Sequence, residues 1–225
     1  MAFLAVSDPA VPEVAAALAA RLPAATAIVH TSGSLELAAL AAARAAGHQT
    51  GSFHPFQSFP VARRPEAFAG SLIGVDAADE ELAQRLFRLA RDIGGHPRRV
   101  PDEQRALYHV AAVLGSNLVV GLAGTAASVL EALGWTEEEA LGALVPLLSG
   151  VVDNLGREGL GGALIGPIRR GDAATVRRHL GELERRGLED AARIYRIVGI
   201  ATLELALATG LDRASGEQIR EALTG

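Results

Sequence analysis

The stretch Gly51-Ser52-Phe53-His54-Pro55-Phe56-Gln57-Ser58-Phe59 holds the strongest candidate for chemistry in this chain, which is His54. His54 ends an expected strand, and Pro55 keeps it extended because the residue before a proline avoids the helical region. An imidazole at the end of a strand could exchange a proton near neutral pH. Half of the chain's six phenylalanines lie in this stretch and would give it apolar walls. A structural histidine beside a proline turn is the alternative, and the pattern slightly favours a functional role.

A second candidate stretch is His30-Thr31-Ser32-Gly33-Ser34. It follows an expected strand at 26–31, and ligands bind at the carboxyl ends of strands in open α/β sheets. Its hydroxyl groups and its glycine turn could present backbone N–H groups to an anion or a carbonyl. The alternative is a plain strand-to-helix turn with Ser34 as the helix N-cap. For this stretch alone, the pattern favours the plain turn.

Polar residues also occur on a long expected helix at 102–133. At 100° per residue, one face of that helix carries Arg105, His109, Ala112 and Ser116. Asn117 lies beside this face, and Tyr108 lies nearer the other side. Polar groups in an otherwise apolar helix serve either a site or a buried hydrogen-bond network, and the sequence leaves both open.

Two arginines, Arg169 and Arg170, follow a glycine-rich segment that begins at Gly159. No strand precedes these glycines, so they do not meet the context of a phosphate-binding loop. The arginines could hold a carboxylate or phosphate by paired hydrogen bonds. The alternative is a connecting loop in which Asp172 caps the next helix. The six histidines show no paired ligand spacing, so we expect no structural metal.

The arrangement of elements predicts two domains. Strands are expected at 2–7, 26–31, 49–54 and 71–75, and helices at 14–22, 34–46 and 79–93. This alternation predicts an α/β domain with parallel strand pairing over residues 1–100. Residues 101–225 are expected to be helical, with the helix at 102–133, one opened by a Thr136–Glu139 capping box, and helices at 172–186 and 188–209. The predicted class is α/β followed by all-α.

Composition narrows the classes of protein to which the chain can belong. The 225 residues are 49% apolar and 21% charged, which is typical of a globular protein, and a net charge of −5 gives no basic surface for nucleic acid. The chain has no cysteine and no lysine, which excludes thiolate nucleophiles and lysine Schiff bases from it. The longest apolar run, 141–152, is shorter than the roughly 20 residues of a membrane span. We therefore expect a cytoplasmic protein with no membrane or nucleic-acid partner.

Four segments together, HTSGS, GSFHPFQSF, LYHVAAVLGSN and GPIRRGD, resemble one family in order and spacing along almost the whole chain. They are similar to Rossmann-like, oxidoreductase-related proteins whose C-terminal helical domain has no known function. These proteins are distant relatives of pyrroline-5-carboxylate reductase, prephenate dehydrogenase and the 6-phosphogluconate dehydrogenase group. The resemblance implies a dinucleotide-binding domain, a helical dimerisation domain with a 6-phosphogluconate-dehydrogenase-like fold, and NADP or NAD as the cofactor.

The resemblance also implies roles for single residues. In the similar prephenate dehydrogenases, a serine at one strand end and a histidine before a proline act at the substrate. By this resemblance the catalytic residues are His54, Ser32, His109 and Asn117, the substrate-binding residues are Ser34, Gln57, Ser116, Arg169 and Arg170, and the cofactor-binding residues are Ser7, Thr31 and Gly33. Related β-hydroxyacid dehydrogenases use a lysine on the helix that carries His109, and this chain has none.

The chain departs from the family at its beginning. No GxGxxG sequence occurs in it, and the family pattern implies a further βαβ unit of about 60 residues before Ala2. We therefore expect a truncated Rossmann-like sheet whose first strand has an exposed apolar edge. A partner chain covering this edge, a rearrangement of the strands, and a start inside a longer gene are the three alternatives.

Two classes of function follow. The first is an NAD(P)-dependent oxidoreductase that acts on a small carbonyl, imine or hydroxy compound, with His54 exchanging the proton. The second is a non-catalytic dimeric scaffold or ligand-binding remnant that no longer binds the nicotinamide cofactor. In both cases we expect a homodimer, because the apolar helices at 102–133 and 188–209 exceed what one small core buries.

Overall fold

The computed structural model describes residues 1–59, 61 and 65–225. The chain divides into two compact units, Met1–Leu118 and Val119–Gly225. The first unit contains the whole sheet and the second is helical, so the predicted class of α/β followed by helices is confirmed. The helix that begins at Asp102, which the sequence places in the second domain, lies in the first compact unit.

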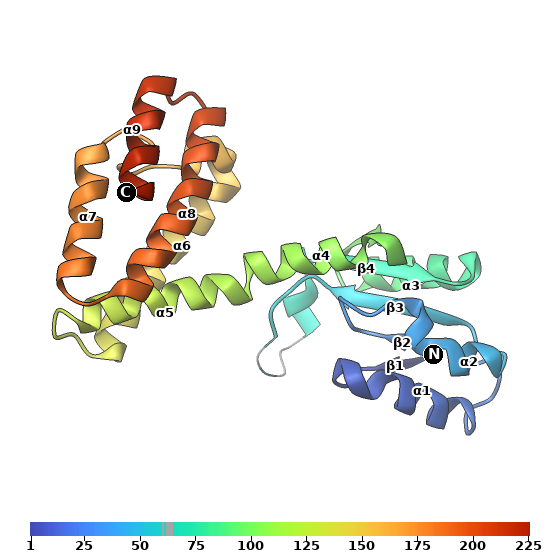
Figure 1. Cartoon of the computed structure of the whole chain (residues 1–225). Coiled ribbons are helices and arrows are strands. Elements are labelled where there is room, and N and C mark those ends of the chain that lie inside the picture. The colour runs from blue at the N-terminus through green and yellow to red at the C-terminus, as the bar shows by residue number, and fades with distance from the viewer. Residues whose placement is uncertain (60, 62–64) are drawn as a thin grey trace. The chain divides into compact units, whose positions relative to one another are not determined.

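The first unit is built on one five-stranded sheet (Figure 1). Its strands are β1 (Ala2–Leu4), β2 (Ile28–His30), β3 (Thr50–Pro55), β4 (Leu72–Ala77) and β5 (His96–Arg99), and they lie in this order across the sheet. The pairs β1–β2, β2–β3 and β4–β5 are parallel, whereas β3 and β4 are antiparallel. The expectation of parallel pairing throughout was therefore wrong at β3–β4. The only helical element described between these strands is the short turn η3 (Pro65–Phe68), too short for the crossover that parallel strands require.

Strand β5 was not predicted, because Pro97 and Pro101 suggest a break in structure. The strand forms nevertheless, with Pro97 opposite Ile73 of β4. Proline lacks the N–H that a central strand must donate, but β5 is an edge strand and pairs only with β4. Pro101 then directly precedes the next helix.

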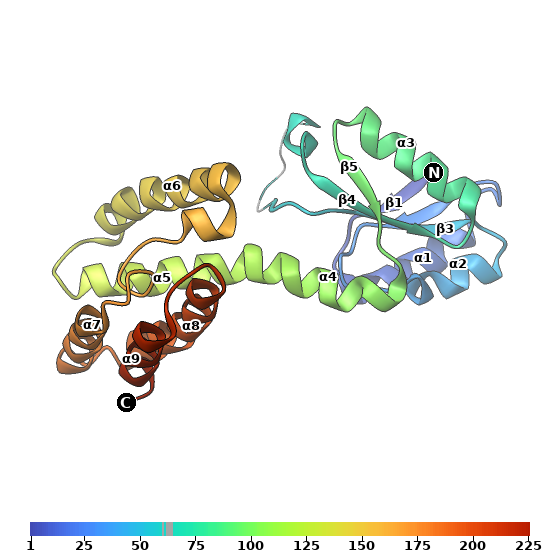
Figure 2. The same cartoon turned by 90° about the horizontal axis from the view of Figure 1, so that it is seen from above.

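The helical elements of the first unit are η1 (Asp8–Ala10), α1 (Val11–Ala19), η2 (Leu37–Leu40), α2 (Ala41–Ala45), η3, α3 (Glu80–Asp92) and α4 (Asp102–Gly115). Helices lie on both faces of the sheet, as Figure 2 shows. Side chains of consecutive strand residues point to opposite faces, so Ile28 packs with Val11 of α1 while Val29 packs with Leu86 of α3. Ser52 and His54 point to the face that α4 covers.

The expected helix from Ser34 to 46 forms only in part, as η2 and α2. Ser34 does not cap it. The hydroxyl of Ser34 donates to the carboxylate of Asp8 at 2.6 Å, and the hydroxyl that accepts from the backbone N–H groups of this turn, those of Ser34 and Leu35, is that of Ser32. Glu36 precedes η2 without a side-chain cap.

The single helix expected at 102–133 is two helices, α4 and α5 (Asn117–Glu131). Ser116 separates them, with backbone angles of φ −132° and ψ −77°. Its hydroxyl donates to the carbonyl of Ala112 at 2.6 Å, and it also contacts the side-chain oxygen of Asn117 at 2.9 Å. A serine that bonds to nearby backbone in this way competes with the helical ladder.

The second unit comprises most of α5 together with α6 (Glu137–Ala163), α7 (Ala173–Arg185), α8 (Glu189–Ala208) and α9 (Arg213–Thr224). The Thr136–Glu139 capping box and the Asp172 cap of α7 are both present, as predicted. Helix α6 extends into the expected glycine-rich joint as far as Ala163, and Gly159 at φ 65° breaks its regular geometry. Helix α9 was not predicted.

Helices α7, α8 and α9 enclose the core of the second unit. Its fully buried members include Val176, Leu203 and Ile219, one from each helix. In contrast, Ala140 is the only buried residue of the 27-residue helix α6. The segment Asp102–Glu131 is long and apolar enough to cross a membrane by length and composition, and only 6% of its most apolar 18 residues is buried. This segment is longer than the run at 141–152, but polar residues interrupt it.

Candidate functional site

The candidate site lies where the first three strands of the sheet end. Because β1, β2 and β3 are parallel, their carboxyl ends meet at the same edge. Leu4, His30 and Ser52 form one row across these strands. His54 lies two residues beyond Ser52 and so points to the same face of the sheet, toward α4.

The side chain of His54 is held by Tyr108 of α4. Nδ1 of His54 lies 2.8 Å from the hydroxyl oxygen of Tyr108, and the hydroxyl is also 3.4 Å from the carbonyl oxygen of His54. The phenol reaches this position because Gly74 leaves room for it: a Cβ atom on Gly74 would lie 2.8 Å from the Tyr108 oxygen. The remaining nitrogen of His54, Nε2, has no hydrogen-bond partner among the described residues.

Two imidazole nitrogens converge on Gly33. A Cβ atom on Gly33 would lie 2.7 Å from Nε2 of His54 and 3.0 Å from Nδ1 of His109. Nδ1 of His109 is buried and has no hydrogen-bond partner among the described residues. Buried polar atoms are nearly always satisfied, so this unpaired nitrogen is an exception in the described part of the protein. Glycine is the one residue that lets the turn after β2 pack this closely on both rings.

The electrostatics of the site favour neutral side chains. Burial, followed by the neighbouring His109 and Arg105, lowers the pKa of His54 to about 4. Burial raises the pKa of Tyr108 to about 12. At neutral pH the site therefore presents an uncharged imidazole bonded to an uncharged phenol. A neutral imidazole can donate or accept one hydrogen bond at Nε2 without carrying a charge.

Arg105 fastens α4 to the strand ends and is only 1% exposed. Its guanidinium donates to the hydroxyl of Ser52, to the carbonyl of Val100 at 3.3 Å and to the carbonyl of Ser32 at 3.4 Å. Asp102, one turn earlier, accepts from its Nε at 3.4 Å and from the backbone N–H of Leu37 at 3.0 Å. These bonds fix the helix that carries Tyr108 and His109, so Arg105 is a positioning residue.

The predicted hydroxyl residues after β2 lie beside this cluster, but most of their hydrogen bonds go to the turn itself or to residues near β1. Ser32 accepts from the backbone N–H groups of Ser34 and Leu35, both at 3.1 Å. Thr31 donates to the carbonyl of Leu4 at 3.1 Å, and Ser34 donates to Asp8. These contacts shape the turn that presents Gly33.

Among the hydrogen bonds of the described residues, none joins the other predicted site residues of the first unit to this cluster. Ser7 is exposed at the start of η1, and Gln57 is exposed and accepts from the N–H of Ser58. Ser116 and Asn117 contact each other at the break between α4 and α5. The hydroxyl of Ser116 forms its hydrogen bonds at this break.

Arg169 and Arg170 lie in the second unit. Arg169 donates to the carbonyl of Thr209 at 3.3 Å, which ties the loop before α7 to the end of α8. Arg170 is exposed and lies near Asp172 in the loop that precedes α7. Within this unit, both residues belong to the connection between helices.

Three residues of the cluster were absent from the predicted site: Tyr108, Arg105 and His30. Tyr108 was expected nearer the other side of the helix from His109. Positions 105, 108 and 109 in fact share one helix face, because they are three and four residues apart, and this spacing could have predicted that the three side chains lie together. His30 is fully buried, and neither of its ring nitrogens has a partner among the described residues. Burial and the charge of Arg105 lower the pKa of His30 to about 4.

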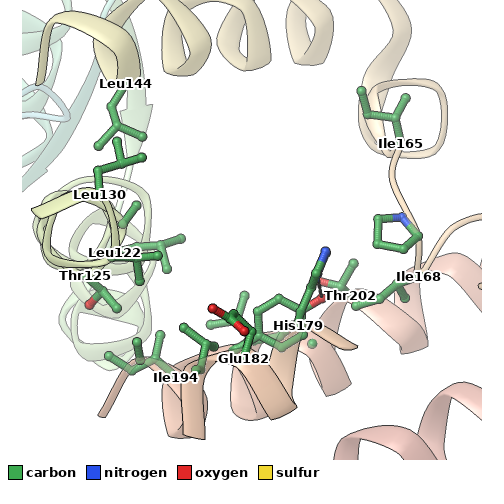
Figure 3. Close-up of a pocket in the computed structure, with 18 residues that line it drawn as sticks. Leu122, Thr125, Leu130, Leu144, Ile165, Ile168, His179, Glu182, Ile194 and Thr202 are labelled. Atoms are coloured by element: carbon green, nitrogen blue, oxygen red, sulfur yellow. Dashed lines mark hydrogen bonds between the residues drawn. The ribbon is translucent and has the colours of Figure 1, made fainter. Parts of the chain in front are cut away.

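A separate cavity of about 600 Å³ lies within the second unit, between α5, α6, α7 and α8. Figure 3 shows Leu122 and Leu130 of α5 on one side of this cavity and Ile165 and Ile168 on the opposite side. Its polar groups include His179 and Tyr195, which contact each other at 3.0 Å. The lining is otherwise mostly apolar, so it resembles an uncovered interior surface more than a catalytic cleft.

The described residues do not supply the usual binding site of a dinucleotide. Gly33 packs closely on the rings of His54 and His109, so that even a Cβ atom there would lie 2.7 Å from Nε2 of His54. No GxGxxG sequence is present, however, and the helical turn after β1 begins with the carboxylate of Asp8, which repels a diphosphate. The residues present do not supply a cradle for the diphosphate. No group of three metal-ligating side chains occurs within residues 1–59, 61 and 65–225.

Solved structures share this fold. A candidate NADP oxidoreductase of Bacteroides fragilis matches with a TM-score of 0.70 and 22% identity, over 97% of this chain and 74% of that one. Protein TM1727 of Thermotoga maritima matches with a TM-score of 0.72 and 29% identity, over 91% and 78%. The pyrroline carboxylate reductase of Plasmodium falciparum, solved with NADP bound, matches with a TM-score of 0.57 and 12% identity, over 99% and 79%.

Comparison with protein families shows the family of the chain, which the solved structures alone do not. No curated protein matches it. The model of one family matches residues 71–202, which run from β4 to α8 and include Tyr108 and His109. This match covers more than half of the chain. The chain therefore belongs to the family defined by the domain of unknown function DUF2520.

Proposed function

We propose that this chain is an oxidoreductase that acts on a small carbonyl, imine or hydroxy compound bound beside His54 and His109. The observation that carries the proposal is that Nε2 of His54 and Nδ1 of His109 both lie against Gly33, with neither nitrogen hydrogen-bonded to a described residue. A reacting oxygen or nitrogen atom that approached both nitrogens would form a hydrogen bond with each ring. The names of two structural relatives, an NADP oxidoreductase and a reductase solved with NADP, support the same reaction class.

In this proposal His54 handles the proton of the reacting group. When a carbonyl is reduced, Nε2 of His54 gives its proton to the reacting oxygen while the Tyr108 hydroxyl proton passes to Nδ1, so the imidazole stays neutral and the charge moves to the phenol oxygen. Oxidation of a hydroxyl runs the same two transfers in reverse. His109 offers the second hydrogen bond to the reacting atom. The hydroxyl residues of the turn, Ser32 and Ser34, keep Gly33 in place.

The proposed cofactor is NADP or NAD, which would supply or accept the hydride. Its diphosphate is the part for which this chain offers no glycine-rich cradle. The second candidate function rests on that observation: a dimeric scaffold or ligand-binding protein that keeps the pocket without binding the dinucleotide. The two functions predict opposite results in a titration.

The first experiment is a titration of the purified chain with NADPH and with NADH, followed by thermal shift. Saturable binding supports the oxidoreductase, and turnover is then measured with a panel of small carbonyl compounds. His54→Gln should lower turnover at least a hundredfold with unchanged circular dichroism, because an amide can still donate a hydrogen bond but cannot exchange a proton as the imidazole does. His96→Gln, at an exposed histidine on β5, is the control. A folded protein that binds neither nucleotide favours the scaffold.

We further propose that the protein is a cytoplasmic homodimer that pairs through its helical unit. Helix α6 exposes Val145, Leu147 and Val152 by 57%, 64% and 67%, and the cavity beside it is apolar. Exposed apolar surface on this scale normally marks an interface. A second copy of the same helices has the complementary apolar character.

A further inference from the structure

A pocket of about 300 Å³ lies behind Tyr108, between α4 and the edge strand β5. Four of its lining residues decide its chemistry: Arg98, Gln104, Phe56 and Tyr108. No carboxylate lines it among the residues that the structure describes. A pocket of this size is at the small end of the range for organic ligands.

The strand register defines where this pocket lies relative to His54. His54 of β3 is opposite Gly74 of β4, and Gly74 is opposite Arg98 of β5. Register partners point to the same face of a sheet, so His54 and Arg98 lie on one face, two strand spacings or about 10 Å apart. Tyr108 lies over Gly74, between them.

Arg98 brings a charge to this pocket that is not neutralised within it. The side chains of Arg98 and Gln104 make no hydrogen bond or ion pair with any residue in the described part of the chain. The neighbouring Arg99 differs, because Glu80 at 2.9 Å and Asp76 at 3.6 Å neutralise it. An arginine fork and an amide next to aromatic walls are the groups that bind a carboxylate on a flat apolar body.

The side walls of the pocket are aromatic and apolar, so they favour a ligand with a flat apolar body. The rings of Phe56 and Tyr108 lie 5.0 Å apart with an interplanar angle of 54°. Leu72, Val100 and Ala111 add apolar groups to the lining, which Arg99 completes. A bare inorganic anion would leave these walls in contact with water.

We infer that the Arg98 pocket binds a small carboxylate with an aromatic or flat apolar body, at a site separate from the cluster of His54 and His109. The carboxylate lies against Arg98 and Gln104, and the body lies against Phe56 and Tyr108. Because the Tyr108 ring forms the wall shared with His54, an occupant of the pocket also restrains the side chain that holds His54. The inference does not depend on the proposed reaction, since it requires neither a nucleotide nor turnover.

The test is a two-dimensional NMR titration of the isotope-labelled full chain with benzoate, benzamide and inorganic phosphate at constant ionic strength. Benzoate and benzamide have the same shape and differ in charge. Benzoate should shift the amide resonances of Gly74, Arg98 and Val100, with benzamide and phosphate at least tenfold weaker. Phosphate equal to benzoate would overturn the apolar part of the inference, and benzamide equal to benzoate would overturn the role of the charge.

Substitution of Arg98 is the second test of the inference. Arg98→Gln should weaken benzoate binding at least tenfold, and Arg98→Lys should recover part of the affinity. Arg88→Gln is the matched control, because Arg88 is exposed on α3, on the other face of the sheet. Both positions are exposed, so the fold is expected to tolerate all three changes. An unchanged benzoate affinity in Arg98→Gln, or shifts confined to other parts of the protein, would overturn the inference whatever the nucleotide titration gives.

Discussion

Nδ1 of His54 lies 2.8 Å from the hydroxyl oxygen of Tyr108, although the two residues are 54 positions apart in the sequence. This contact joins the end of β3 to the middle of α4 and turns Nε2 of His54 toward Gly33. It depends on Gly74, because any larger residue there would take the place of the phenol. The pair is the centre of the candidate site.

Removing the Tyr108 hydroxyl should release the His54 ring without unfolding the protein. In Tyr108→Phe we expect turnover to fall by roughly tenfold to a hundredfold, because the imidazole loses the bond that fixes its tautomer. The tautomer is followed by the nitrogen resonances of His54. Tyr195→Phe is the control, since Tyr195 contacts His179 at 3.0 Å in the second unit. Equal losses in the two variants would contradict a specific role for Tyr108.

The buried histidines should make stability depend on pH. In the folded protein, burial lowers the pKa of both His30 and His54 to about 4, so the unfolded chain binds protons more readily than the folded one. Above pH 6.5 the two histidines do not change the free energy of unfolding. As the pH falls toward 4, they lower it. Each histidine can lower the free energy of unfolding by at most about 1.4 kcal/mol per pH unit in that window. Urea unfolding at pH 7, 6 and 5 measures this slope.

His30→Leu isolates one of the two contributions. The slope of stability against pH should flatten between pH 6 and 5, and no hydrogen bond to a described residue is lost, because the ring nitrogens of His30 have none. His96→Leu at an exposed position should leave the slope as in the wild type. A slope in His30→Leu identical to that of the wild type would show that the ring is solvated in the folded protein.

A side chain at position 33 should close the site. The added methyl group of Gly33→Ala would lie 2.7 Å from Nε2 of His54, so the ring must move. We expect destabilisation of about 1–3 kcal/mol and loss of most turnover. Gly181→Ala is the control, because nothing lies within 4 Å of its added methyl group and alanine favours a helix. Full activity in Gly33→Ala would place the reacting atom elsewhere.

A charge on α6 should separate the proposed dimer. Val152 is 67% exposed, and we expect Val152→Glu to convert the dimer to a monomer at micromolar concentration, because burying the carboxylate in an apolar interface is unfavourable. Sedimentation velocity measures the change. Ala41→Glu, at an exposed position of α2, adds the same charge away from the helical unit. A monomeric wild type would refute the dimer outright.

The sequence by itself determined the features that depend on neighbouring residues. The alternation of strands and helices predicted the α/β class, and the Thr136–Glu139 box and Asp172 cap were predicted because a cap bonds within three residues of itself. The position of His54 near the end of a strand followed from the proline after it. These signals need no knowledge of distant segments.

Only the tertiary structure decided which distant groups meet. The antiparallel β3–β4 pair, the strand β5 containing Pro97, and the break at Ser116 all depend on backbone partners that local patterns do not specify. The candidate site shows the same limit. Tyr108 reaches His54 because Gly74, on the strand between β3 and β5, leaves the space, and a glycine's empty volume gives no periodic signal in a sequence. Packing across the sheet, rather than spacing along the chain, selected Tyr108 and Arg105.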